Sequence, residues 1–331
     1  MKPGRRIEKI FKWYKDYQYV KNKRIMITGA AGFIGSNLVE FLVKENEVLG
    51  IDNLSSGTED NIREFYSSKN FKFKKLDVKD KDEMKQVMNG IDIVFHLSAN
   101  ADVRRGFDDP VIDFRENALA THNLLECMRE KDVKELVFAS TSAIYGNAGI
   151  IPTPETYGPL KPISHYGASK LAAEAFIFSF SDNYDFKSSV FRFANVVGKR
   201  GTHGVIFDFI EKLKKDNKRL EVLGDGTQSK SYIHVEDCVR GMTELHGKGD
   251  GLFNLGTKER TSVSKIADLV VSRYAPNAKI RYVGGPGGAG WKGDIKVMQL
   301  DVSKALRNGW KYKFESTESV KTAIEEIGAS A

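Results

Sequence analysis

The stretch RIMITGAAGFIGSNLVEFL, residues 24–42, constrains the fold more than any other part of the chain. It reads as a short apolar strand, a turn that contains Gly29, Gly32 and Gly35, and the start of a helix. A strand that turns directly into a helix presents free backbone N–H groups and the positive end of the helix dipole, which together attract a phosphate. Glycine lets such a turn close tightly and lets a pyrophosphate approach the backbone. The spacing is G-x-x-G-x-x-G instead of the commoner G-x-G-x-x-G, so the turn predicts a variant of the dinucleotide-binding type.

Strand-like and helix-like segments alternate through the first 195 residues. Apolar runs of strand length are separated by segments with apolar residues at helical spacing, such as 33–42 and 109–131. In the second of these, a proline near the start and Lys131 at the end suit the two ends of a helix. The alternation predicts an α/β fold with a doubly wound parallel sheet of the Rossmann type. The expected strands are 24–28, 47–51, 71–76, 92–97, 135–140 and 188–193.

The pattern changes after about residue 195, where strands become short and helices follow at longer intervals. We therefore expect a nucleotide-binding domain over 24–195 and a smaller substrate-binding lobe over 196–331, with some segments of the lobe returning to the first domain. Ligands bind outside the carboxyl ends of the strands in open α/β sheets, so this lobe would cover a cofactor at the glycine turn. Its expected helices are 204–216, 235–246, 262–274 and 316–327.

Residues 1–23 precede the first strand and form a separate basic, amphipathic extension. Its apolar residues share one helical face, with basic residues around them. Such a helix either packs on the body of the protein or on a partner subunit, or it lies on a membrane surface. The sequence alone leaves both interpretations open.

Composition narrows the class of protein. A chain of 331 residues with 41% hydrophobic content can bury a sizeable core. Cys127 and Cys238 are far apart, which argues against a disulfide framework and fits a reducing cytoplasm. No apolar run approaches the roughly 20 residues of a membrane span, and the six histidines make no metal-ligand pattern. Lysines are scattered among acidic residues despite the net charge of +7, so we expect no nucleic-acid partner.

Asp52 ends the second expected strand, 17 residues after Gly35. At this point of a nucleotide-binding fold, a carboxylate accepts hydrogen bonds from the ribose hydroxyls of an adenosine. Its charge would repel a 2′-phosphate, which favours NAD over NADP. The alternative is that Asp52 serves only as a turn residue at the end of the strand.

Tyr166 and Lys170 lie four residues apart in HYGASK and would share one face of a helix. A tyrosine titrates near 10, too high for a base at neutral pH. A neighbouring ammonium and a cationic nicotinamide ring stabilise its phenolate and lower its pKa. The structural alternative is that Tyr166 packs in the interior of the protein while Lys170 lies in solvent.

A hydroxyl cluster, Ser140, Thr141 and Ser142, follows the expected strand 135–140. Such a cluster is either a plain turn or a set of donors to a substrate oxygen. The glycine turn, the hydroxyl cluster and the tyrosine–lysine pair come in chain order, and this combination favours the second interpretation.

Together these segments resemble the extended short-chain dehydrogenase/reductase family, and within it the nucleotide-sugar epimerases, most closely the UDP-glucose 4-epimerases of archaeal type. The resemblance covers residues 24 to about 327. It is carried by TGAAGFIGSNL, IDNLSSG, LDVKD, FHLSANADV, FRENALATHNLLE, ASTSAIYG, YGASK, FRFANVVGKRG, LGDGTQSKSYIHVEDC, FNLGT and KGDIKVMQLDVSKA.

The resemblance implies NAD as the cofactor, a UDP-sugar as the substrate, and a role for each matching position. For the cofactor, it implies Gly29, Gly32, Phe33, Ile34 and Gly35 at the pyrophosphate, Asp52 and Asn53 at the ribose, Asp77 and Val78 at the adenine, and Leu97, Ser98 and Ala99 at the nicotinamide, supported by Asn117. For the reaction, it implies Tyr166 as the base, Lys170 as the residue that holds the nicotinamide ribose, and Thr141 as the catalytic hydroxyl. For the substrate, it implies Thr141, Ser142, Tyr166, Asn195, Val205, Lys230 and Trp291.

Two departures affect the substrate half. The family's usual Arg-Asp-Phe is replaced by Lys230, Ser231 and Tyr232, and lysine keeps the charge but loses the bidentate fork of arginine. Where many relatives have an arginine shortly before a later Gly-Asp, this chain has Trp291, which we expect to stack on the base or ribose of the nucleotide.

The residues after Thr141 indicate the reaction. Dehydratases of the family place an acidic pair there, decarboxylases a glutamate at the second position, and 3,5-epimerases of plant type a cysteine. This chain has Ser142 and Ala143, which leaves 4-epimerisation or reduction of a 4-keto sugar. A non-catalytic NAD sensor is disfavoured because Tyr166 and Lys170 are both present. The sugar stays open between glucose, N-acetylglucosamine and a uronic acid, and the resemblance implies a homodimer through 109–131 and 166–182.

Overall fold

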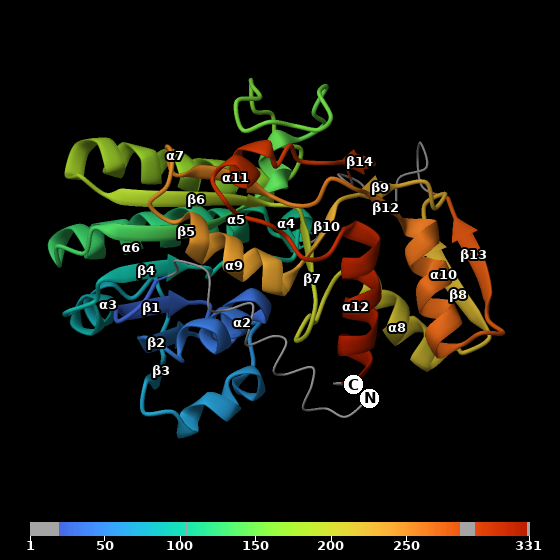
Figure 1. Ribbon diagram of the computed structural model, residues 1–331, viewed down its shortest axis with the longest axis horizontal. Helices are drawn as coiled ribbons and strands as arrows, with labels where there is room; N and C mark the ends of the chain where they lie inside the picture. The colour runs from blue at the N-terminus through green and yellow to red at the C-terminus, as the bar shows by residue number, and fades with distance from the viewer. Residues whose placement is uncertain (1–19, 104, 285–294, 330–331) are drawn as a thin grey trace.

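One sheet of seven parallel strands forms the centre of the protein (Figure 1). The computed structural model describes residues 20–103, 105–284 and 295–329. The strand order is β11-β6-β5-β4-β1-β2-β3, which confirms the expected α/β fold with a doubly wound sheet. The strands are β1 (Arg24–Thr28), β2 (Glu47–Asp52), β3 (Phe71–Lys75), β4 (Ile93–His96), β5 (Glu135–Thr141), β6 (Lys187–Phe193) and β11 (Leu252–Leu255).

Helices cover both faces of the sheet and create two cores. On β1, the side chains of Ile25 and Ile27 enter one core and that of Met26 enters the other, because side chains alternate along a strand. The first core lies against α2 (Phe33–Leu42) and α9 (Val235–Leu245). The second lies against α3 (Lys81–Val87), α6 (Ala120–Glu130) and α7 (His165–Tyr184). Burial on both faces explains why these strands read as apolar runs.

The strand order reverses between β1 and β4, which are hydrogen-bonded neighbours. The chain builds β2 and β3 on one side of β1 and then crosses to β4 on the other. Such a switch point opens a crevice at the carboxyl ends of the two strands. The glycine turn follows β1 and residues 97–99 follow β4, so both lie at this crevice.

A third core forms the smaller C-terminal lobe (Figure 1). It packs α8 (Val205–Lys215), α10 (Val263–Tyr274) and α12 (Ser316–Ala329) against the paired strands β8 (Arg219–Leu223) and β13 (Lys279–Val283). The lobe is not continuous in sequence, because α9 and β11 return to the large sheet. The connecting elements are β7 (Asn195–Val197), β9 (Ser229–Lys230), β10 (Tyr232–His234), β12 (Thr261–Ser262), β14 (Val297–Met298) and α11 (Ser303–Arg307).

The expected helix 109–131 differs in detail. It consists of α5 (Pro110–Asp113), a π-helical turn (Phe114–Leu119) and α6, and it is preceded by α4 (Arg105–Asp108). A π turn inserts one extra residue per turn and re-aims the side chains within it. Short 3-10 helices are Glu59–Asn61, Arg63–Ser67 and Ser142–Tyr145. Residues 1–19 of the N-terminal extension lie outside the described part of the chain. In the part that is described, we find no helix with the length and apolar character to cross a bilayer.

Candidate active site

The glycine turn approaches its neighbours too closely for any side chain. A Cβ on Gly35 would lie 1.9 Å from the carbonyl oxygen of Gly29, and one on Gly29 would lie 2.8 Å from the backbone nitrogen of Ser98. Gly29 also has a positive φ of 71°, which glycine adopts at little cost. Gly32 is the N-cap of α2, with no side-chain cap among the described residues. The start of α2, with Phe33 and Ile34 in its first turn, thus offers backbone donors to a phosphate.

Asp52 ends β2 and faces the glycine turn. Its Oδ2 accepts from the backbone nitrogen of Ala31 at 3.0 Å, and its Oδ1 accepts from that of Leu54 at 2.8 Å. Burial raises the pKa of this carboxyl, against the two backbone hydrogen bonds that lower it. Each oxygen keeps a second lone pair for a further donor. The ribose role of Asp52 stays a prediction that this placement supports.

The ends of β2 and β3 also meet here. The Asn53 side-chain amide donates to Oδ2 of Asp77 at 3.0 Å. A hollow of about 310 Å³ opens beside them, lined by Asn53, Lys75, Leu76, Asp77, Asp80 and Glu83. Asp77 and Val78, the residues expected at the adenine, thus lie next to those expected at the ribose, on the far side of β2 from the crevice.

Residues Leu97, Ser98 and Ala99 follow β4 and are held against β1. The Thr28 hydroxyl accepts from the backbone nitrogens of Leu97 and Ser98 at 3.2 and 3.3 Å. His96 is buried beneath them, with Nδ1 2.7 Å from the Thr28 hydroxyl and Nε2 3.0 Å from that of Thr121. Burial, together with the nearby charge of Lys170, lowers the pKa of His96 to about 3. A neutral His96 is therefore part of the framework.

Tyr166 and Lys170 lie in the first two turns of α7, whose start is capped by the Ser164 hydroxyl at 3.1 Å from the nitrogen of Gly167. Burial raises the pKa of Tyr166 to about 12, while a hydrogen bond with Thr141 lowers it and the charge of Asp113 raises it. Thr141 ends β5, so the structure brings the three predicted catalytic residues together.

Lys170 is fully buried, with its Nζ 3.9 Å from the centroid of the Phe138 ring. Burial lowers its pKa to about 7, against the charge of Glu174, which raises it. A buried ammonium close to a phenol favours the phenolate when it is charged. Lys170 is therefore a buried, titratable group one helical turn from Tyr166, and the alternative in which it lies in solvent is wrong.

The π-helical turn links the segment after β4 to α7. Asn117 accepts from the backbone nitrogen of Asn100 at 2.8 Å and donates to the Ser169 hydroxyl at 2.9 Å. The Ser169 hydroxyl in turn donates to the carbonyl oxygen of Tyr166 at 2.8 Å. Asp113 accepts from the Asn100 amide at 2.8 Å, and burial raises the pKa of its carboxyl. Asn117 thus lies where a residue that supports the nicotinamide region was expected, while Asn100 and Asp113 were missed.

The expected substrate residues lie around the start of the second lobe. Asn195 begins β7 and pairs with Tyr232 of β10, Val205 begins α8, and Lys230 ends β9. Ser142 follows Thr141 in a buried 3-10 turn. Their contacts with a nucleotide sugar stay predictions, and Trp291 lies outside the described residues.

Sequence reasoning also missed two buried charged residues beside the site, Glu174 and Arg192. The signal was present for Glu174, because it continues the four-residue spacing from Tyr166 through Lys170. Nothing in the local pattern marked Arg192, which lies in an apolar strand.

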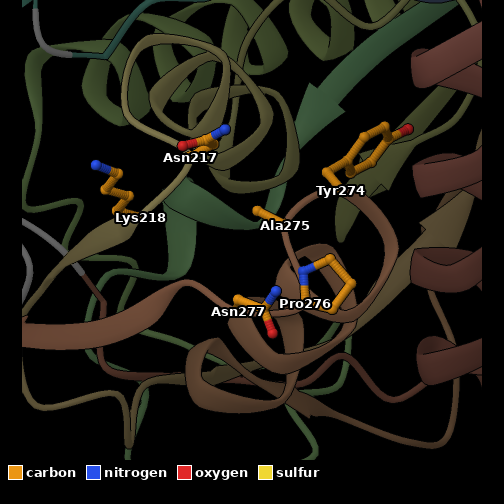
Figure 2. A pocket seen from close by; sticks show the side chains of 6 residues that line it. All are labelled: Asn217, Lys218, Tyr274, Ala275, Pro276 and Asn277. Atoms are coloured by element: carbon orange, nitrogen blue, oxygen red, sulfur yellow. The ribbon is translucent and has the colours of Figure 1, made fainter.

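A second hollow, of about 330 Å³, lies in the C-terminal lobe (Figure 2). It is lined by Asn217, Lys218, Tyr274, Ala275, Pro276 and Asn277. These residues lie just before β8 and at or just after the end of α10, and none belongs to the crevice of the large sheet.

The switch-point crevice and the glycine turn are those of a dinucleotide-binding α/β fold, with Thr141, Tyr166 and Lys170 on the neighbouring β5 and α7. Residues 25–256 match the model of the NAD dependent epimerase/dehydratase family. The chain belongs to this family, which confirms the resemblance and NAD as the cofactor.

Relatives that are named for different substrates have almost equal similarity to this chain. The chain is 32% identical over 321 residues to the UDP-glucose 4-epimerase of Mycolicibacterium smegmatis, covering 91% of this chain and 97% of that one. It is 33% identical over 314 residues to the UDP-glucuronate 4-epimerase of Thermodesulfobacterium geofontis, covering 90% and 94%. The solved UDP-glucose 4-epimerase of Thermotoga maritima with UDP-glucose superposes with a TM-score of 0.83 at 32% identity, covering 93% and 99%.

Proposed function

We propose that the protein catalyses NAD-dependent epimerisation at carbon 4 of a UDP-sugar, with UDP-glucose and UDP-galactose as the pair. One observation carries this proposal: Thr141, Tyr166 and Lys170 converge at the crevice, and the two residues after Thr141 are Ser142 and Ala143. This set provides a base and a hydroxyl donor but lacks the acid at those positions that elimination of water requires. The similarity to UDP-glucose 4-epimerases supports the same conclusion.

The residues at the crevice fit NAD. The side-chain-free surface of Gly29, Gly32 and Gly35 would hold the pyrophosphate, Asp52 would hold the adenosine ribose, and Lys170 the nicotinamide ribose. When bound, NAD supplies an acceptor and later a donor for the hydride at carbon 4.

Tyr166 takes the proton of the 4-hydroxyl. Its phenol lies in hydrogen-bonding contact with Thr141, so the Thr141 hydroxyl steadies the same oxygen. The ammonium of Lys170 stabilises the phenolate from within the helix. After the 4-keto sugar has turned in the pocket, Tyr166 would return its proton to the oxygen at carbon 4. We place the nucleotide against the second lobe, at Asn195, Val205, Lys230 and Trp291.

Turnover of UDP-glucose to UDP-galactose by purified protein without added NAD tests the proposal. An epimerase restores its cofactor in each cycle, so activity should need no external NAD. A panel with UDP-N-acetylglucosamine and UDP-glucuronate, analysed by chromatography, identifies the preferred sugar. Strict dependence on added NAD(P)H would instead indicate a 4-keto reductase.

We further propose a homodimer formed through α5, the π-helical turn, α6 and α7. Val111, Phe114, Leu119, Phe176 and Phe178 on these helices are 37% to 56% exposed, which is unusual for large apolar residues and suits an isologous contact. The double substitution Phe114→Asp and Phe176→Asp should give a monomer in light scattering after size exclusion. A wild-type monomer at micromolar concentration would contradict this assembly.

A further inference from the structure

Glu174 and Arg192 form a buried ion pair between α7, the helix that carries Tyr166 and Lys170, and the sheet. Their side chains are 1% and 5% exposed. The guanidinium donates to both carboxylate oxygens, with Nε to Oε1 at 3.1 Å and Nη2 to Oε2 at 2.7 Å. Glu174 comes from α7 and Arg192 from β6. The pair therefore joins the helix that carries Tyr166 and Lys170 to the sheet.

The same carboxylate also contacts the strand that carries Thr141. The Ser140 hydroxyl donates to Oε1 of Glu174, and Ser140 lies opposite Arg192 in the register of the parallel strands β5 and β6. Because side chains alternate along β5, Ser140 and Phe138 project to the same face of the sheet. Phe138 contacts the ammonium of Lys170, which lies one helical turn before Glu174. The Glu174 carboxylate thus contacts Ser140, the residue before Thr141, on the face of β5 that also carries Phe138, whose ring contacts Lys170.

Arg192 is anchored at its other end by a hydrogen-bonded chain. Its Nη1 donates to the Tyr145 hydroxyl at 2.9 Å, and Tyr145 donates to Oδ1 of Asn254 at 2.8 Å. Tyr145 lies in the 3-10 turn after Thr141 and Asn254 lies in β11. A buried pair held this rigidly has little freedom to re-aim its carboxylate.

Stability alone accounts poorly for such a pair. Replacing a buried ion pair by apolar residues of similar volume is often neutral or stabilising, because the desolvation of both charges is costly. Beyond these polar partners the neighbouring side chains belong to the second core, which contains Ala173 and Ile177 of α7 and Phe138 of β5. The location of the pair next to three catalytic residues suggests a role in their chemistry.

We propose that Glu174 is a positioning residue of the reaction: its carboxylate, fixed by Arg192 and Ser140, supports the Lys170 ammonium and holds the Thr141 end of β5 against α7. This inference rests on the proposed function. Glu174 touches neither substrate nor cofactor. It acts through Lys170, whose charge the phenolate of Tyr166 needs, and through the strand end that presents Thr141.

The charges around Lys170 agree with this role. From β4, His96 is neutral, since burial and Lys170 lower its pKa to about 3. From α5, Asp113 acts on Tyr166, and from β6 Arg192 is paired with Glu174. Burial lowers the pKa of Lys170 to about 7, and Glu174 is the group that opposes this shift. Without the carboxylate, Lys170 should lose its proton at a lower pH.

The pH profile of kcat/KM tests the inference in the holoenzyme. Glu174→Gln retains the shape of the side chain and removes its charge, and it should move the alkaline limb to lower pH by about one unit. The double variant Glu174→Gln/Arg192→Gln avoids an unpaired buried guanidinium and should show a shift in the same direction. Ser140→Ala keeps both charges, so it should lower kcat without moving the limb.

Arg240 and Glu244 provide a matched control. They form another buried pair, 3.1 Å apart and 6% and 5% exposed, on α9. Glu244→Gln/Arg240→Gln should lower the Tm, because the buried Asp237 loses its contact with Arg240 at 3.3 Å, and it should not move the alkaline limb. If the limb of Glu174→Gln/Arg192→Gln coincides with that of an active wild type, Glu174 has no such role. A wild type that converts no UDP-sugar overturns the proposed function as well, so the two failures are distinguishable.

Discussion

Gly35→Ala separates the effect of helix propensity from that of the close approach in the glycine turn. Gly35 lies inside α2, where alanine is favoured over glycine by about 0.5–1 kcal/mol. Its φ is not in the left-handed region, so propensity alone predicts a more stable protein. The structure predicts the opposite sign.

The magnitude follows from the contacts of the added methyl group. A Cβ at Gly35 would lie 1.9 Å from the oxygen and 2.8 Å from the carbonyl carbon of Gly29, and 3.0 Å from the Cα of Ala30. All three are backbone atoms, so the turn itself must move by about an ångström or more to reach van der Waals distance. Overpacking of this kind costs about 1–3 kcal/mol, which outweighs the gain in propensity. The displaced atoms are those that approach the pyrophosphate, so NAD binding should weaken at least about tenfold.

The assay is the NAD content of the purified protein, determined by chromatography after denaturation, together with the Tm of the protein. We expect Gly35→Ala to carry little NAD and to melt several degrees below the wild type. Gly149→Ala is the matched control, because a Cβ there meets nothing within 4 Å. A Gly35→Ala protein with full NAD content and a raised Tm would refute the argument from close approach.

Three further substitutions test the site. Tyr166→Phe should lower kcat by a factor of about 10²–10⁴ and leave the NAD content unchanged. The control Tyr184→Phe, at an exposed tyrosine, should be active. Substantial turnover by Tyr166→Phe would show that another group is the base. Asp52→Ala should weaken NAD binding and narrow the preference for NAD over NADP in calorimetric titrations, and an unchanged preference would leave Asp52 as a turn residue only. Lys170→Met should raise the Tm of cofactor-free protein, since the pKa of Lys170 is lowered from 10.5 to about 7 and folding must desolvate or deprotonate it. This rise in Tm should be largest at and below pH 7. It should shrink as the pH rises towards 10, because deprotonating Lys170 on folding then costs less free energy. A rise in Tm that is independent of pH would contradict a buried, titrating Lys170.

The sequence was informative where a feature can be recognised from a few neighbouring residues in the chain. The glycine turn, the strand-end Asp52 and the i,i+4 pair Tyr166–Lys170 each follow from spacing within a few residues, and the structure places all of them at one crevice or beside it. Expected strand ends were correct to within one residue, mainly because strands buried on both faces read as apolar runs, whereas β3 alternates Phe and Lys and is only partly buried.

Features that depend on distant packing could not be predicted. The π-helical turn that aims Asn117 at Ser169 interrupts a segment whose apolar spacing looks continuously helical. We expected some segments of the lobe to return to the first domain, but no local pattern indicates that β11 pairs with β6 and that α9 covers one face of the large sheet. The pairing of Glu174 with Arg192 likewise depends on the packing of α7 over β6.

The electrostatics of the catalytic pair connect burial to the direction of proton transfer. The same burial raises the pKa of Tyr166 to about 12 and lowers that of Lys170 to about 7, so each group is shifted towards its neutral form. The protein opposes both shifts only in part, through Thr141 at the phenol and Glu174 behind the amine. A further positive charge next to the phenol is required, and an oxidised nicotinamide ring carries one, whereas a reduced ring does not. Under the proposed mechanism, Tyr166 should therefore be a phenolate that can accept a proton beside the oxidised cofactor, and a protonated phenol beside the reduced one. The protonated phenol is the form that can return a proton to the sugar oxygen, so a phenol that is a weak acid on its own suits both halves of the proposed reaction.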